Sequence, residues 1–546
     1  MKKVLFLILI ISFSFGLSAN DLTISNVRLL NQNTSFGFNN TNNYSMVSFD
    51  MSWANSWRVS SGPSNWDAVW VFVKFRVSGG NWQHASLHQN GHMIPSNASL
   101  AVGLRFPDSS FQTTTNPGLG VFIYRKQDGV GIFSVTNVQL RWNYAAQGIT
   151  DTSKIDLQVL GIEMVYVPQA SFYVGDGATT SLHGQFRNAT SNTPFLINSE
   201  AAITLGGSTD GNLTNNNSSG MLFADDFSNS QTQNLPARFP KGFNAFYCMK
   251  YEVTQGQYRD FLNLLTRTQQ SIRASTTTVG AFAGGIFWTG TFVNNANPTT
   301  PLNRIGLKLV SDPGSPQSRT YACDFNNNNT YNESADGASI AMGLVSWSDL
   351  LSYLDWSGLR PMTELEYEKA CRGTATPIAN EFAWGTTSIV RSQGVLNPGL
   401  PNELPSNSNA NAVYDGVTAV LGPMRVGCFS NSSSTRASSG ATYYGIMEMS
   451  GNVYERVVTV GHSSARLFTG IHGNGTISSN GHANENFWPG NSNGEVFQAW
   501  GASCRGGLWN TWDNELRISS RARINDPNGD RISYFGGRGV RTAPTL

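Results

Sequence analysis

Residues 503–516 read SCRGGLWNTWDNEL, and this stretch decides how the second half of the chain is interpreted. The pair Gly506 and Gly507 predicts a tight turn, because glycine adopts positive φ without steric cost. Trp509 and Trp512 follow at once, and large aromatic side chains contribute strongly to cores. We therefore expect a glycine turn that sets both tryptophans into a loop-rich core, so that the stretch marks a fold.

The composition is that of a globular, loop-rich protein with a preference for strands, because 11% of residues are aromatic and 55 are glycine. A chain of 546 residues is too long for one ordinary core and suits about two or three domains. The 36 lysines and arginines nearly cancel the 35 aspartates and glutamates. No global field therefore attracts nucleic acid or an anionic membrane.

Residues 1–19 have the pattern of a secretory signal peptide. Lys2 and Lys3 form a basic start, residues 4–15 an apolar core, and residues 16–19 an exit of small residues. A membrane anchor is the alternative, but the apolar run is short for a spanning helix. We expect cleavage near Ala19, no transmembrane segment afterwards, and a mature protein in the periplasm, at the cell surface or outside the cell.

Residues 20–150 have the pattern of an N-terminal all-β sandwich. Apolar residues occupy every second position of 47–53, as in a half-buried strand, and 68–77 is a denser β-branched and aromatic run. Residues 127–129, Gln-Asp-Gly, lie between two apolar runs and predict a hairpin. Short strands separated by Gly, Asn, Pro and Ser loops favour a sandwich.

Three histidines in this segment, His84, His88 and His92, recur every four residues, which is a spacing that metal sites on helices use. Gly91 and Pro95 argue against a helix here, and no carboxylate is near in sequence. We therefore expect a hairpin with exposed histidines, and not a metal site.

The cysteines are spaced by dozens of residues, which excludes a CxxC metal or redox motif. Their odd number leaves at least one free or paired between chains, and the predicted compartment permits disulfides. We expect buried cysteines acting as small hydrophobic residues, with room for one bridge. They are Cys248, Cys323, Cys371, Cys428 and Cys504.

Residues 151–546 combine helical and strand patterns and form the second predicted domain. The polar, partly low-complexity stretch at about 177–240 is expected to be a loop insertion at the surface. Helices are expected where a Ser or Thr precedes a Gln, Asp or Glu by three residues, since such side chains cap a helix start. These pairs are Thr254 with Gln257, Ser346 with Asp349, and Thr363 with Glu366.

Four motifs, in order along about residues 160–546, resemble those of the formylglycine-generating enzyme, or sulfatase-modifying factor, family. The resemblance implies an α+β fold, with a mixed α+β, loop-rich domain related in shape to C-type lectins after the β-sandwich. Ordered agreement of several degenerate motifs is stronger evidence for a fold than for an activity. The motifs are FYCMKYEVTQGQYRDFLN at 246–263, RPMTELEYE at 360–368, GIMEMSGNVYER at 445–456 and SCRGGLWNTWDNEL at 503–516.

The resemblance also implies where chemistry would lie. Enzymes of the family bind copper through two cysteines, which this chain replaces with Thr511 and Leu516. Copper(I) needs soft sulfur ligands, and Cys504 precedes Arg505 on the opposite face of the strand. A related branch uses histidine-bound iron, and the seven histidines here lack the two-His-plus-carboxylate spacing. We therefore expect neither copper nor iron.

A structural Ca²⁺ is the metal that the resemblance favours. Family members hold calcium with one side chain, two backbone carbonyls and one acid, which are oxygen ligands that a hard cation prefers. Arg456 stands where the family has Trp and is a candidate to neutralise the neighbouring acid. The matching positions are Glu448, Gly451, Val453 and Glu455.

The C-terminal tail carries seven arginines, which permit two interpretations. They could form an anion- or glycan-binding groove with Trp509 and Trp512 as stacking platforms. Alternatively, they tie loops together through Asp513, Asp526, Asp530 and backbone carbonyls, which we favour. The arginines are Arg505, Arg517, Arg521, Arg523, Arg531, Arg538 and Arg541.

The leading hypothesis is a secreted, non-catalytic protein that binds or scaffolds a protein or glycan partner, or self-assembles, at the cell surface or in an extracellular assembly. The first alternative is an oxidoreductase of the same superfamily with a non-standard metal site. The second is a carbohydrate-binding protein, because the first domain carries several tryptophans that could stack on sugars. They are Trp53, Trp57, Trp66 and Trp70.

Overall fold

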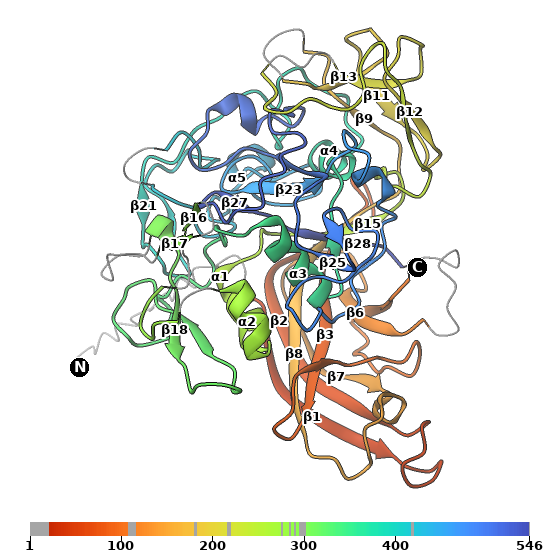
Figure 1. Ribbon diagram of the computed structural model, residues 1–546, viewed down its shortest axis with the longest axis vertical. Helices are drawn as coiled ribbons and strands as arrows, with labels where there is room; N and C mark the ends of the chain where they lie inside the picture. The colour runs from red at the N-terminus through yellow and green to blue at the C-terminus, as the bar shows by residue number, and fades with distance from the viewer. Residues whose placement is uncertain are drawn as a thin grey trace, which may run out of the picture.

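The computed structural model shows a β-rich chain with few helices (Figure 1). The predicted signal peptide at 1–19 lies outside the residues that the structure describes. Within the described part, no helix is long and apolar enough to cross a membrane. The structure describes residues 21–106, 116–178, 183–215, 220–274, 277–282, 286–288, 291–293, 302–416 and 420–544.

The N-terminal segment begins with a three-stranded antiparallel sheet in the order β1-β2-β7. Its central strand carries the alternating pattern, and the apolar residues at 47, 49, 51 and 53 are all buried. The strand expected over 47–53 is therefore confirmed. The strands are β1 (Thr23–Asn33), β2 (Tyr44–Arg58) and β7 (Gly129–Trp142).

A second, longer sheet runs from the N-terminal segment into the rest of the chain, in the order β20-β28-β15-β8-β3-β6-β5, with β4 paired to β3. Strand β8 follows residue 150, yet it pairs with β3 along its whole length and with β15 on the other side. The two predicted segments therefore share one sheet. Its strands are β3 (Asp67–Val77), β4 (Gln83–His84), β5 (Ala98–Leu104), β6 (Gly118–Arg125), β8 (Ile155–Val167), β15 (Phe246–Met249), β20 (Arg360–Pro361) and β28 (Gly539–Thr542).

Strand β3 lies between two cores, which explains its dense apolar sequence. Val69, Val71 and Val73 face a core shared with β2 and β7. Trp70 and Phe72, on the opposite face, enter the core shared with the C-terminal part of the chain. Successive side chains of a strand point to opposite faces, so one strand joins both cores.

The helices begin where the capping boxes are. In each predicted box the Ser or Thr hydroxyl accepts from the backbone N–H three residues on, and the third residue bonds back to the cap. The capping predictions are therefore confirmed. The helices are α1 (Gln255–Asn263), α2 (Arg267–Arg273), α3 (Trp347–Trp356), α4 (Glu364–Arg372) and α5 (Arg436–Ser439).

The stretch at about 177–240 is not only loop, as expected, because it contains short strands in the order β10-β13-β12-β14. Figure 1 labels β12 and β13 of this sheet. Phe186, Leu205, Leu213 and Leu235 are buried and join the large core. This packing comes from single apolar residues that are widely spaced among polar ones. The stretch as a whole therefore has low hydrophobicity, and its sequence pattern does not predict the strands. The strands are β10 (Phe186–Asn188), β12 (Ile203–Leu205), β13 (Leu213–Asn215) and β14 (Gln233–Leu235).

The C-terminal part is built mostly from short strands linked by long, ordered loops. A three-stranded sheet in the order β26-β23-β27 carries two of the sequence motifs. It consists of β23 (Tyr454–Val458), β26 (Ala502–Arg505) and β27 (Phe535–Gly536). The remaining pairs are β9 (Phe172–Val174) with β11 (Phe195–Ile197), β16 (Ile286–Trp288) with β17 (Thr291–Val293), β18 (Leu307–Ser311) with β19 (Thr320–Cys323), β21 (Val395–Leu396) with β22 (Leu404–Pro405), and β24 (Asn491–Ser492) with β25 (Glu495–Val496).

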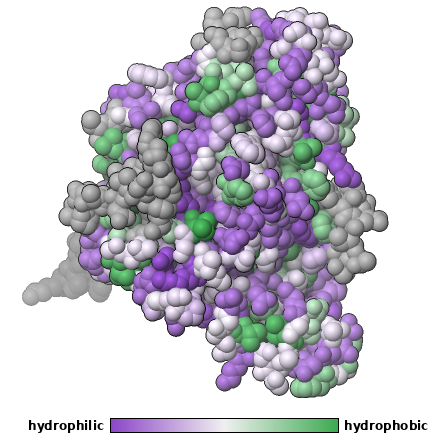
Figure 2. Space-filling view, in the orientation of Figure 1, coloured by the Kyte–Doolittle hydropathy of each residue, from purple (hydrophilic) through white to green (hydrophobic). Residues whose placement is uncertain are grey.

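The face of the molecule that Figure 2 shows is predominantly polar. Figure 2 shows one face that is largely hydrophilic, with small apolar groups, one of them at the end of the molecule that β1, β2 and β7 form. Many of the apolar side chains are instead buried in the cores.

Candidate functional site

The glycine turn predicted from residues 503–516 is present at the end of β26. Gly506 and Gly507 have φ of +82° and +69°. A Cβ on Gly507 would lie 2.4 Å from Cδ1 of Leu516, and one on Gly506 would lie 2.8 Å from the carbonyl of Met449. Both the backbone conformation and the close packing therefore require glycine.

The two tryptophans of the stretch have different environments. Trp509 is 5% exposed and packs in a core with Tyr454, Cys504 and Phe535. Trp512 is 72% exposed, so the expectation that it enters the core is wrong. It precedes a short 3-10 turn, η5 (Asp513–Leu516), where the chain runs at the surface before Leu516 returns it to the interior.

Thr511 and Leu516, the positions predicted from the motif to correspond to the family's copper ligands, hold no sulfur. The Thr511 hydroxyl accepts from the Leu508 backbone N–H at 3.2 Å and lies 3.3 Å from its carbonyl, so it closes its own loop. Leu516 is fully buried in a core. Cys504, the nearest cysteine in sequence, is also buried, and burial raises the pKa of its thiol to about 12. This thiol stays protonated at neutral pH.

Arg505 lies in a buried ion-pair network with helix α4. Its Nη1 donates to Glu364 at 3.0 Å and its Nη2 to Glu368 at 2.6 Å. Arg521 donates to the same Glu364 and to Asp225, each at 2.8 Å. All five side chains are fully buried. The network joins β26, the start of α4, the tail and the 183–240 region, so Arg505 serves the fold.

The tail arginines bind carboxylates, in agreement with the interpretation we favoured, although most partners are distant in sequence. Asp513 and Asp526 pair with Arg517 and Arg523 as expected, but Asp530 forms no ion pair among the described residues, and its neighbour Arg531 pairs with Asp349 instead. In the described part of the chain, Arg541 pairs with no carboxylate. The long-range pairs are Arg505 with Glu364 and Glu368, Arg521 with Asp225 and Glu364, Arg531 with Asp349, and Arg538 with Glu455.

The proposed calcium ligands lie in a buried acidic cluster. Glu448 has φ of +55° and accepts from the Gly427 N–H at 2.7 Å, while Glu455 accepts from Arg538 at 2.5 Å. Glu252, which sequence reasoning missed, lies beside them and accepts from the Val453 N–H at 3.1 Å. Burial raises the pKa of all three carboxyls, that of Glu448 to about 7.

The cluster has features that suit a cation. One carboxylate oxygen of Glu448 and one of Glu455 are buried without a hydrogen-bond partner. Among the described residues, no three His, Cys, Asp or Glu side chains converge as metal ligands. The predicted ligand set has only two carboxylates, completed by the carbonyls of Gly451 and Val453, and such mixed oxygen ligands are compatible with Ca²⁺. The two unpartnered carboxylate oxygens are therefore the observation that favours the predicted ion.

Arg456 does not neutralise Glu455, contrary to the sequence-based expectation. Successive residues of β23 point to opposite faces, so the two side chains separate. The Arg456 guanidinium lies 4.3 Å from the ring centroid of Phe535 and donates to the Asn528 carbonyl at 3.1 Å. Arg538, which follows β27, takes the expected role.

The first-domain histidines and the cysteines are structural. His84 is buried and contacts the Leu119 carbonyl at 2.6 Å, so the expectation of three exposed histidines is wrong for it. His88 and His92 are both half-buried, with the His92 ring against the His88 carbonyl, so the expectation of exposed histidines is wrong for them too. The five cysteines are buried and free, and no disulfide joins them.

The tryptophans of the first segment do not form a stacking surface. Trp53, Trp66 and Trp70 are buried in the two cores. Trp57 is half-buried, with the Lys250 ammonium 4.9 Å from its ring centroid. The carbohydrate-binding alternative depended on these tryptophans being available to stack on sugars. In the structure they pack against other protein groups instead.

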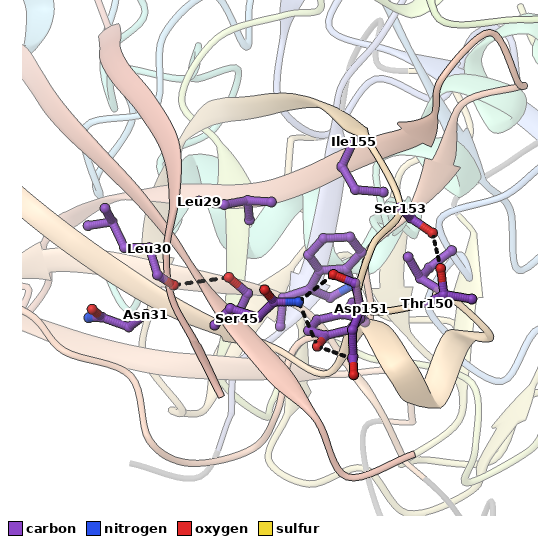
Figure 3. A pocket seen from close by; sticks show the side chains of 12 residues that line it. Leu29, Leu30, Asn31, Ser45, Thr150, Asp151, Ser153 and Ile155 are labelled. Carbon is purple, nitrogen blue, oxygen red and sulfur yellow. Dashed lines mark hydrogen bonds between the residues drawn. The ribbon is translucent and has the colours of Figure 1, made fainter. Parts of the chain in front are cut away.

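A cavity of about 330 Å³ opens beside β1 and β2, and Figure 3 shows its lining. Asp151 accepts from the Tyr144 hydroxyl at 2.6 Å, and Ser45 donates to the Leu30 carbonyl at 3.0 Å. Thr150 bonds to Ser153 at 2.7 Å. Because these polar groups already form hydrogen bonds with protein partners, few of their donors and acceptors remain for a ligand.

Together, the strand-rich core, the short capped helices and the glycine turn locked by buried arginines define an α+β protein whose loops are held by ion pairs. The family model described as "Sulfatase-modifying factor enzyme 1-like domain" matches residues 206–543, more than half of the chain. The chain belongs to this family, and the resemblance inferred from the motifs is confirmed.

Among solved structures, the chain is similar to "Treponema denticola variable protein 1", with 11% sequence identity and a TM-score of 0.28. That match covers 70% of this chain and 96% of the other. No curated protein matches the chain in sequence.

Proposed function

We propose that this protein is a secreted, non-catalytic member of the sulfatase-modifying factor family. It acts as a binding or scaffolding component at the cell surface or in an extracellular assembly. One observation carries the proposal: Thr511 and Leu516 occupy the positions that match the copper-binding cysteines of the family's enzymes. Neither a hydroxyl nor an alkyl group replaces a thiolate as a ligand for copper(I).

The surroundings of these positions support the proposal. Leu516 is fully buried against Gly507 and Gly451, so its side chain occupies space that an open site would need. The Thr511 hydroxyl is engaged by its own loop. The Cys504 thiol is buried, and its raised pKa leaves little thiolate to act as a nucleophile or ligand.

Secretion is supported by the signal pattern at 1–19. A binding role is supported by the added N-terminal strands, which share a continuous sheet with the family domain. Two parts joined by one continuous sheet suit presentation of a surface to a protein or glycan partner.

We also infer that a structural Ca²⁺ is held by the Glu448 and Glu455 side chains and the carbonyls of Gly451 and Val453. The two unpartnered carboxylate oxygens support this assignment. When bound, the ion would supply positive charge to a buried cluster in which Arg538 faces three carboxylates. Its role would be to hold the loop of residues 448–453 against the start of β23, where Glu455 lies.

The test is an oxidation assay of the purified mature protein with copper, oxygen and a peptide that carries a sulfatase-type cysteine. We expect no aldehyde by mass spectrometry under conditions in which an active family enzyme converts the same peptide. Aldehyde formation that depends on this protein would overturn the proposal.

Metal analysis of the same preparation separates the proposal from the oxidoreductase alternative. We expect calcium or no metal. Stoichiometric copper or iron that survives dialysis would instead favour an oxidoreductase with a non-standard site, especially if the metal were lost on substitution of its ligands.

A further inference from the structure

A cleft of about 690 Å³ lies on the outer face of the sheet β1-β2-β7, the face that points away from the core. Val47 and Leu140 point into that core, so Met46 and Arg141, the residues next to them, lie on the outer face. The volume falls within the ~300–1,000 Å³ of ordinary ligand sites. All lining residues lie well inside the described ranges 21–106 and 116–178.

The sheet supplies the floor of the cleft and two loops supply its walls. Tyr44, Met46 and Arg141, on the central strand β2 and on β7, form the floor. Residues 31–35, at the end of β1, form the wall on one side. Gly91 and Met93 form the wall on the other side, where Met93 pairs with Gln139 of β7.

Arg141 is held in place on the floor with free donors. Its guanidinium lies 4.1 Å from the ring centroid of Tyr44, and its Nε donates to Asn143 at 3.3 Å. Neither Nη donates to a described residue, and no described carboxylate forms an ion pair with this half-buried side chain.

The space beside Nη1 of Arg141 is open. A Cβ on Gly91 would lie 3.5 Å from this nitrogen. Apart from Arg141 itself and the chain neighbours of Gly91, no atom lies within 4 Å of that Cβ position. The guanidinium therefore reaches the cleft, and its planar pair of Nη donors matches the geometry of a carboxylate.

The lining offers no carboxylate of its own to this guanidinium, because it contains no Asp or Glu. The wall at 31–35 instead supplies neutral polar groups. The Thr34 side chain is exposed and its hydroxyl bonds to no described residue. Asn31 donates its amide to Gln139 at 3.3 Å, which leaves its carbonyl oxygen unused among the described residues.

The wall and the floor are fixed to each other. Asn33 donates to the Tyr44 hydroxyl at 3.2 Å and accepts from the Ser35 hydroxyl at 2.7 Å. The groups that remain free are thus presented by an ordered frame, which lowers the entropic cost of binding.

A ligand that complements this cleft carries a carboxylate for Arg141, hydroxyl groups for the wall and a compact C–H surface for Met46 and Met93. A uronic acid has all three on one ring. A hydrophobic acid has no hydroxyl groups for Asn31 and Thr34, and an acidic peptide carries its carboxylates on flexible side chains that lose entropy on binding.

We propose that the cleft binds an acidic saccharide, whose carboxylate pairs with both Nη atoms of Arg141 and whose hydroxyl groups bind Asn31 and Thr34. This inference rests on the proposed binding role and names the chemical class of the partner. The cleft is separate from Thr511 and Leu516, so a lack of saccharide binding would leave the outcome of the oxidation assay unchanged.

The test titrates the full mature chain with the methyl glycosides of glucuronic and galacturonic acid at constant ionic strength. The neutral controls are the methyl glycosides of glucose and galactose, which carry a hydroxymethyl group in place of the carboxylate. We expect saturable binding of at least one acid, and affinity for its neutral counterpart at least about tenfold weaker, because the charged hydrogen bonds are lost.

Equal affinity for acid and neutral sugar, or no saturable binding of either acid, would overturn the proposal. A triglutamate peptide should bind more weakly than the preferred acid. Tighter binding of the peptide would also overturn the proposal and would favour an acidic protein partner instead.

Four variants assign the response to this cleft. Arg141→Met should abolish binding of the acid, since it keeps an apolar stem on Tyr44 and removes the charge. Thr34→Glu, at the exposed wall, should weaken binding severalfold, whereas Thr34→Lys should not weaken it. Arg28→Met removes an exposed arginine of the same sheet face outside the lining and should bind as the wild type does. Unchanged affinity in a folded Arg141→Met, or equal effects of the two Thr34 variants, would contradict the assignment.

Discussion

At the scale of single residues, the glycine turn explains why residues 503–516 mark the fold. Gly507 adopts positive φ and leaves room for Leu516, which fills the interior beneath the turn. The motif resemblance predicts that the family's enzymes place a cysteine at the position of this leucine. Because Gly507 and Leu516 are in close contact, a substitution at either residue should disturb the packing of the other.

Gly507→Ala should lower the free energy of unfolding by more than about 1 kcal/mol, because positive φ and overpacking both oppose the new Cβ. Gly529→Ala is the control, since nothing lies within 4 Å of its would-be Cβ, and it should change stability by less than about 0.5 kcal/mol. Chemical denaturation measures both. Equal effects would show that the Leu516 packing does not constrain Gly507.

The calcium assignment also belongs to this scale. Added CaCl₂ should raise Tm in a concentration-dependent way, because a ligand that binds only the folded state stabilises it. Glu448→Gln should remove most of this response, since a neutral amide binds the ion less strongly than a carboxylate does. Asp128→Asn, an exposed change in the N-terminal segment, should keep the response. A calcium response that persists in Glu448→Gln would exclude this site.

At the scale of elements, buried ion pairs hold the loops that lack regular structure. Arg505 and Arg521 connect β26 and the tail to the first turns of α4, where Glu364 and Glu368 lie. The carboxylates near the helix start also suit the helix dipole. The hydrogen bonds of these fully buried groups compensate for their desolvation only while all members are present.

Arg505→Met should therefore destabilise the protein by about 3–5 kcal/mol, because it leaves carboxylates of α4 incompletely paired in the interior. The matched change at a surface pair, Arg76→Met, removes a 2.7 Å contact to the half-exposed Asp156 and should cost at most about 1 kcal/mol. Thermal and chemical unfolding compare the two. A small effect at Arg505 would mean that Arg521 and Arg372 compensate for its loss.

At the scale of the whole molecule, the N-terminal strands and the family domain are joined by a shared sheet and by a buried charge cluster. Lys250, directly after β15, lies 3.3 Å from Asp67 on β3 and 3.1 Å from Glu163 on β8. Two carboxylates thus share one ammonium group. Burial raises the pKa of Glu163 to about 7, and the neighbouring Asp67 adds to the effect.

A carboxyl whose pKa is raised on folding stabilises the folded state at low pH, and this contribution is lost as pH rises. For Glu163 the loss should run from its ordinary pKa of 4.5 to about 7 and amount to about 3 kcal/mol. Glu163→Gln should therefore gain stability relative to the wild type between pH 5 and pH 8. Denaturant unfolding across this range measures the difference, with Asp156→Asn as an exposed control that should show no such trend.

Much of the local structure could be predicted, because strand alternation and capping boxes are properties of a few neighbouring residues. The strand over 47–53, the capped helices and the turn at Gly506 and Gly507 all follow such rules. The region around 177–240 could not, since its strands form from isolated apolar residues that only the surrounding core makes sufficient.

The sequence by itself determined the family frame, the glycine turn and the absence of sulfur at Thr511 and Leu516, since each depends on residue identity and short spacing. Only the tertiary structure decided that Arg538, and not Arg456, faces Glu455, that Trp512 lies at the surface, and that Arg541 alone among the tail arginines has no carboxylate partner in the described residues. The physical reason is that charge pairing and burial depend on which distant segments the sheets bring together, and no local pattern encodes those contacts.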